Sequence, residues 1–199
     1  MTTGTKGVGF EDPWPRDGYR LFVEGSWAYD AQVVRDPNER LYRMPMGYSR
    51  AADLLVEQAA ANVVDRNNVI YAAPFCYRQS VELHLKRIIL KFASINRDAT
   101  VTHDLATLWK QFVVLVIERG REQTIGLSPV QVLVAELDQA DKRSDSFRFP
   151  ATLRGLPFAF GDQGIDLDNL PEVMAGLMNF FECAYLDFSH QDDAASNWA

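Results

Sequence analysis

Apolar positions recur with the period of an α-helix along five segments of the chain. The clearest segment runs from about Val69 to Ser94, where apolar residues return every three or four positions: Tyr77, Val81, Leu85, Ile88, Ile89 and Phe92. The same spacing predicts helices at about 49–64, 103–120, 128–144 and 170–188. We therefore expect a mainly α-helical bundle of about five helices, built around one long amphipathic helix.

Residues at the ends of these segments are typical of helix boundaries. Ser49 can accept a hydrogen bond as the N-cap of the first helix. Ser128 and Pro129 form an N-cap followed by proline at the first helical position, and Gly120 is suited to a C-cap. These capping residues agree with the bounds that the apolar spacing predicts.

The first 47 residues do not share the helical pattern. They are rich in proline and glycine, which interrupt long helices, yet they contain too much aromatic surface for a free tail: Phe10, Trp14, Tyr19, Phe22, Trp27, Tyr29 and Tyr42. We expect residues 1–47 to form an irregular arm packed on the core, with a short strand at Tyr19–Val23. The helical domain then covers residues 48–188, and residues 189–199 form a flexible tail.

A loop separates the last two predicted helices. It contains two short extended pieces, Phe147–Pro150 and Pro157–Phe160. A small hairpin at 146–161 is therefore one expected feature of this loop.

The composition fits one globular domain of 199 residues, with 47% hydrophobic and 24% charged residues. The longest apolar run, Phe112–Ile117, is far shorter than the ~20 residues that cross a bilayer. Cys76 and Cys183 lack metal-ligand spacing and are interpreted as reduced, buried thiols. We expect a cytoplasmic protein without a membrane segment, metal or cofactor.

The net charge of −7 argues against broad, non-specific binding to nucleic acids. It leaves room for a local basic patch, because residues 78–97 contain five Lys or Arg residues and a single acid, Glu82. A helical projection puts Arg78, Glu82 and Lys86 in one row on a shoulder of the apolar stripe, at contact spacing. It puts His84 on the opposite shoulder, with Arg87 and Lys91 further out.

Two interpretations of this charged row stay open. The row can be a salt-bridge ladder that only flanks the core, or it can be a partly solvated functional face. Similar alternatives apply to His103 and Asp104, which either begin the third helix, where Asp favours the helix dipole, or join Arg78 and Glu82 in one polar site.

Two further polar groups carry the same kind of ambiguity. Asp138, Asp141 and Asp145 recur at three- and four-residue steps, which favours a solvated acidic face over a metal site because no His or Glu completes a ligand set. Arg148, between two phenylalanines, is interpreted as a latch onto that acidic helix or as an anion contact.

Several short motifs resemble one protein superfamily in their order and spacing. They are the segments Tyr77–Ile89, with its Glu-Leu-x-Leu-Lys pattern, Thr102–Trp109, which begins with His-Asp-Leu, Ser144–Pro150 and Tyr42–Met46. Together they resemble an uncharacterised bacterial branch of the HEPN superfamily (higher eukaryotes and prokaryotes nucleotide-binding), across residues 40–188. The resemblance implies a small helical-bundle domain.

Many members of that superfamily are metal-independent ribonucleases of toxin–antitoxin and anti-phage systems, with a site shared by two protomers. Their signature of Arg, four to six residues and His is matched by Arg78 and His84. The resemblance implies that His84 acts as general acid or base and that Arg78 stabilises phosphate charge. RNA or a nucleotide would contact the remaining polar residues: Glu82, Lys86, His103, Asp104 and Arg148.

The helical projection places Arg78 and His84 on different shoulders, so a ribonuclease requires a homodimer. The alternative function is a non-catalytic HEPN-like scaffold for protein interactions, with a partner encoded nearby. Geometry separates the two. A ribonuclease needs Arg78 and His84 to converge on one open cleft, whereas a scaffold pairs Arg78 with Glu82 and leaves His84 packed or solvated alone.

Overall fold

The computed structural model describes residues 20–22, 31, 33–93, 100–123, 126–152, 154–158 and 164–196. The chain divides into two compact units, residues 1–33 and 34–199, and the helices belong to the second. Most of the expected aromatic arm lies outside the described residues. So do both ends of the expected strand at Tyr19–Val23, and residues 20–22 between them do not form a strand.

The second unit is a helical bundle, and its mainly α-helical class confirms the prediction from the sequence. Within the described residues it contains five long helices and one short helix and lacks strands: α1 (Pro37–Ala61), α2 (Arg66–Val69), α3 (Ala72–Phe92), α4 (Leu105–Glu118), α5 (Leu127–Ala140) and α6 (Asn169–Ser196).

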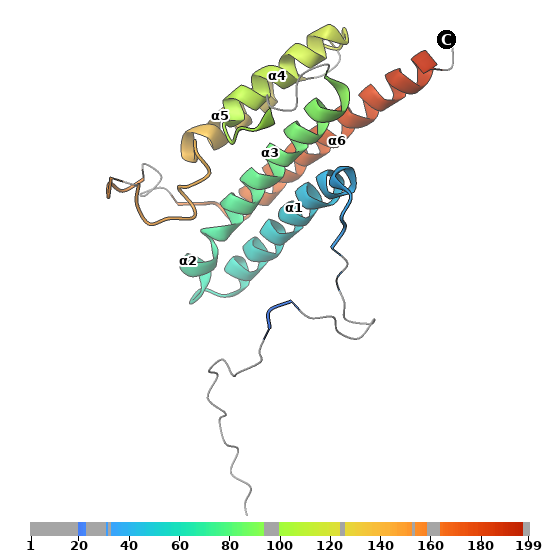
Figure 1. Cartoon of the computed structure of the whole chain (residues 1–199). Helices are drawn as coiled ribbons and strands as arrows, with labels where there is room; N and C mark the ends of the chain where they lie inside the picture. Colours follow the sequence, from blue (N-terminus) through green and yellow to red (C-terminus); the bar gives the residue numbers. More distant parts are fainter. Residues whose placement is uncertain are drawn as a thin grey trace, which may run out of the picture. The chain divides into compact units, whose positions relative to one another are not determined.

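The helix α3 is the centre of the bundle. It packs against α1, α4 and α6, while α5 packs on α4 (Figure 1). Its predicted apolar stripe forms the middle of one continuous core, which also contains Phe112 of α4 and Phe181 and Phe188 of α6. Burial of such large side chains supplies most of the favourable free energy of folding.

The helix α1 begins well before the predicted Ser49, so the expected boundary at residue 47 is wrong. Asp36 is the N-cap, with its side chain accepting from the backbone N–H of Asn38, and Pro37 occupies the first helical turn. Proline is favoured there because the first N–H groups of a helix lack intrahelical partners. Pro45 lies inside the helix, where its carbonyl accepts a hydrogen bond from the Ser80 hydroxyl at 2.8 Å.

The remaining bounds differ in smaller ways. The long central helix begins at Ala72, because a separate turn of helix, α2, occupies 66–69. α6 continues through most of the predicted tail to Ser196, where Arg119 forms an ion pair with Asp192 at 2.8 Å. The described parts of the expected hairpin at 146–161 do not form strands, and a turn in which the Thr152 carbonyl accepts from Gly155 occupies its place.

Candidate functional site

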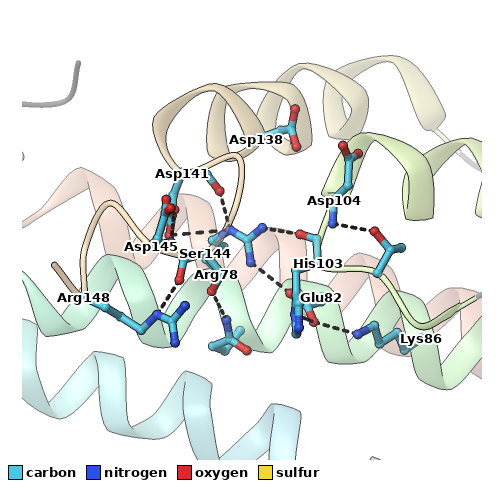
Figure 2. A network of polar contacts seen from close by, with 12 residues as sticks. Arg78, Glu82, Lys86, His103, Asp104, Asp138, Asp141, Ser144, Asp145 and Arg148 are labelled. Carbon is cyan, nitrogen blue, oxygen red and sulfur yellow. Dashed lines mark hydrogen bonds and ion pairs between the residues drawn. The ribbon is translucent and has the colours of Figure 1, made fainter. Parts of the chain in front are cut away.

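Arg78 lies at the centre of a buried polar network between α3 and the helices that cover it (Figure 2). Its side chain is 0% exposed, although the sequence predicted a partly solvated shoulder. Nε donates to the backbone oxygen of Asp141 at 2.7 Å, Nη1 to Glu82 at 2.9 Å and Nη2 to the backbone oxygen of His103 at 2.5 Å. Every guanidinium nitrogen therefore has a protein partner.

Glu82 is the carboxylate of this network, and it is contacted by three cationic or titratable side chains. One oxygen accepts from Arg78, and the other lies 2.8 Å from Lys86 Nζ and 2.9 Å from His103 Nδ1. Burial raises the pKa of Glu82, but the hydrogen bond and charge of Lys86, the charge of His103 and the Arg78 hydrogen bond outweigh it. The pKa is therefore below its ordinary value, and Glu82 is ionised at neutral pH.

The segment that follows α5 closes the network from above. The buried Asp141 accepts from the backbone N–H groups of Asp145 and Ser146 at 2.7 and 2.9 Å, which fixes the turn after the helix. Ser144, at a φ of 59°, has its hydroxyl 2.6 Å from Gln79 Nε2. Asp138 and Asp141 are both buried, so the predicted solvated acidic face is wrong.

His103 and Asp104 divide between the two roles that the sequence left open. The side chain of His103 is 69% exposed and contacts Glu82, so it joins the polar network. Asp104 is the N-cap of α4 and accepts from the backbone N–H of Thr107 at 2.7 Å. This backbone hydrogen bond lowers the pKa of Asp104.

His84 occupies the α6 side of α3, away from this network. It is buried and stacks on Phe181 with ring centroids 5.8 Å apart. Its Nδ1 lies 3.4 Å from Glu182 without forming a hydrogen bond. Burial and then the nearby charge of Arg87 lower the pKa of His84 to about 4, so the imidazole is neutral at pH 7.

Arg87 is also buried, which corrects the prediction that it faces outward. Its guanidinium lies 2.5 Å from Glu182 and stacks over Tyr185 at 3.8 Å from the ring centroid. Glu182 is thus the counterion of Arg87. Because His84 is neutral, it does not add a second positive charge beside this pair.

The polar residues predicted for one site therefore separate into four places, the fourth being the loop after α5 that holds Arg148. Arg78, Glu82, Lys86 and His103 lie together in the network on the α4 and α5 side. Asp104 caps α4 beside it, and His84 packs against α6. Within one chain, Arg78 and His84 do not converge on a cleft. The contribution of Asp141 could not be predicted, because the apolar spacing put this residue inside a helix at 128–144, whereas α5 ends at Ala140.

Arg148 lies apart from the network side chains, in the loop after α5. Its Nε donates to the backbone oxygen of Ser144, and its guanidinium lies 5.7 Å from the centroid of Phe75 and 5.2 Å from that of Phe149. Arg148 thus latches onto a backbone carbonyl just beyond α5, whereas the interpretation from the sequence placed the latch on the acidic helix itself. The exposed Arg148 borders a cavity of about 740 Å³.

Three or more His, Cys, Asp or Glu side chains do not come together as a metal site anywhere in the described residues. Cys76 is half-buried and Cys183 is exposed. The prediction that both thiols are buried is therefore wrong for Cys183. None of the described helices combines the length and apolarity needed to cross a membrane.

Comparisons with known proteins do not identify a relative. A scan of known protein families, a search of curated proteins and a search of solved structures each ended without a match. The class of this protein, a mainly α-helical bundle, therefore comes from its own fold.

Proposed function

We propose that this chain is a non-catalytic, HEPN-like helical module that acts by binding a partner protein. The observation that carries the proposal is the state of Arg78. A guanidinium that stabilises phosphate must present N–H groups to its ligand, but Arg78 is fully buried and each of its nitrogens already binds the protein.

The surroundings of His84 support the same proposal. A general acid or base must reach the substrate and titrate near the working pH. His84 is buried against Phe181 and neutral above a pKa of about 4. A second protomer would meet the same buried side chains, so dimerisation alone would not expose them.

The experiment incubates purified protein with a single-stranded and a hairpin RNA and follows RNA length on denaturing gels. We expect intact RNA with the wild type, with Arg78→Lys, which keeps the positive charge, and with His84→Phe, which keeps a buried ring but removes the imidazole. A mock preparation from the same host controls for contaminating ribonuclease. Cleavage by the wild type that disappears in His84→Phe, with an unchanged circular dichroism spectrum, would overturn the proposal.

A second candidate function is RNA binding or cleavage by a homodimer, in bacterial defence or a toxin–antitoxin system. One observation favours it: the exposed His103 lies 2.9 Å from the buried Glu82 carboxylate. A carboxylate on Nδ1 orients an imidazole and leaves Nε2 available for proton transfer. This candidate predicts RNA cleavage that is lost in His103→Ala but kept in His190→Ala, and a dimer by sedimentation.

A further inference from the structure

A cavity of about 740 Å³ lies between the end of α2 and the loop that follows α5. We call it the α2–loop cavity, and its lining includes four aromatic residues and two arginines: Tyr71, Phe147, Phe149, Phe158, Arg66 and Arg148. Its size is within the range of specific ligand pockets. Arg78, Glu82, Lys86 and His103 of the buried network do not line it.

The charge of this cavity is opposite to that of the whole chain. The chain has a net charge of −7, yet the charged residues that line the α2–loop cavity are Arg66 and Arg148, and its described lining does not include an acid. Two guanidinium groups beside aromatic rings form a local positive field, which favours an anionic group on the ligand.

Both arginines are held in place while part of each guanidinium remains available. Arg66 donates from Nε to the backbone oxygen of Ala59 at 2.9 Å and from Nη2 to that of Ala60 at 3.2 Å, at the end of α1. Arg148 binds the Ser144 carbonyl through Nε alone. Neither arginine forms an ion pair with a described acid, so Nη1 of Arg66 and both terminal nitrogens of Arg148 can bind a carboxylate.

Exposed apolar side chains continue beyond the cavity itself. Tyr71 is 63% exposed and Phe149 is 54% exposed, and Leu156 in the same loop is 60% exposed. Aromatic residues and arginine are enriched at the centres of protein interfaces. A ligand that covers these side chains is therefore larger than the cavity, which points to a polypeptide and not to a small anion.

We infer that the α2–loop cavity binds a short segment of a partner protein that presents a large apolar side chain next to an aspartate or glutamate. The apolar side chain enters among the aromatic rings, and the carboxylate binds Arg148 and Arg66. This inference rests on the proposed scaffold function and names the chemistry of its partner. The overall negative charge disfavours a nucleic acid as the occupant.

The test uses a phage-displayed library of random 12-residue peptides, selected on the wild-type chain after counter-selection on Arg148→Glu. We expect enrichment of peptides in which an acid lies beside an aromatic or large aliphatic residue. The most enriched peptide, synthesised with a fluorescent label, should bind the wild type by anisotropy. Arg148→Glu should weaken that binding by about tenfold or more, since a charge-assisted contact becomes a repulsion.

Arg154 provides a matched control, because it is exposed in the same loop but does not line the cavity. Arg154→Glu should leave peptide affinity within about twofold, as expected for a charge outside the contact. A peptide with its acid replaced by lysine should lose affinity for the wild type and regain it with Arg148→Glu. Circular dichroism checks that each variant keeps its helices.

Three outcomes would overturn the inference: a selection without acidic-apolar peptides, equal affinity for wild type and Arg148→Glu, or a dimer of this chain that Arg148→Glu dissolves. The last outcome would make a second copy the occupant. Failure here is distinguishable from failure of the scaffold proposal, which depends on RNA cleavage. Peptides that bind elsewhere would refute the α2–loop cavity and leave the scaffold proposal standing.

Discussion

The Nε of Arg78 donates to the backbone oxygen of Asp141 at 2.7 Å, although the two residues are 63 positions apart in the sequence. Together with its bond to the His103 carbonyl, this contact connects α3 to the start of α4 and the end of α5 (Figure 2). Because the side chain is buried, the connection is not weakened by competition with water. Arg78 is thus a structural cross-link, and its removal should show in stability.

We expect Arg78→Ala to lower the free energy of unfolding by about 3–5 kcal/mol, because Glu82 and two backbone carbonyls would remain buried without their partner. Urea denaturation followed by circular dichroism measures this. Arg43→Ala is the matched control, since Arg43 forms the same i, i+4 pair with Glu39 on the surface. It should lose about 0.5 kcal/mol or less. Equal losses in the two variants would contradict a structural role for the network.

The lowered pKa of Glu82 predicts a loss of stability in acid. A carboxyl whose pKa is lower in the folded than in the unfolded state stabilises the fold fully above its ordinary value of 4.5. This contribution disappears as the pH falls through the folded-state pKa. The free energy of unfolding of Glu82→Gln should therefore depend less steeply on pH below 4.5 than that of the wild type. A parallel dependence in the two proteins would show that Glu82 is not perturbed.

The pKa of His84, about 4, predicts a second pH range, above that of Glu82, in which the stability depends on pH. Between the ordinary 6.5 and about 4, the unfolded state takes up a proton that the folded imidazole does not, so stability falls as the pH falls. His84→Phe should therefore reduce this slope relative to the wild type. Nuclear magnetic resonance titration of His84 provides the direct check, and a midpoint near 6.5 would contradict burial.

We predict that Asp104 stabilises the fold as the N-cap of α4, and that its charge does not bind a ligand. Asp104→Ala should lose about 1 kcal/mol of stability, because the Thr107 N–H would lose its acceptor. Asp104→Asn keeps a capping oxygen and should lose much less. Thermal unfolding of the two variants measures the difference, and an equal loss in both would show that the carboxylate charge is what matters.

Local spacing was enough to predict most of the fold. The apolar periods of α3, α4, α5 and α6 were visible because each helix buries one stripe against its neighbours. The first half of α1 does not follow from this spacing, because prolines such as Pro37 and Pro45 usually interrupt a helix. In fact Pro37 follows the capping Asp36 at a helix start, and the carbonyl of Pro45 has a distant partner in Ser80.

The candidate site could be predicted only in part. The pairing of Arg78 with Glu82 follows from i, i+4 spacing, which any helix provides. Their burial depends on Asp141 and the His103 carbonyl, which reach α3 from distant parts of the chain. A projection of one helix cannot show which neighbour covers a shoulder. For the same reason it placed Arg87 in solvent, although Tyr185 of α6 covers it.

The three contacts of Glu82 have a consequence for sequence change over evolution. A mutation of the carboxylate alone would leave Lys86 without its buried counterion and Arg78 with only the Asp141 carboxylate, 3.7 Å from Nε. A mutation of Arg78 alone would remove one of the three contacts of the acid. Single steps away from the present combination are therefore disfavoured, while concerted replacement by apolar residues of similar volume is tolerated more easily. In homologous chains, positions 78 and 82 should consequently vary as a pair, with both residues retained or both exchanged.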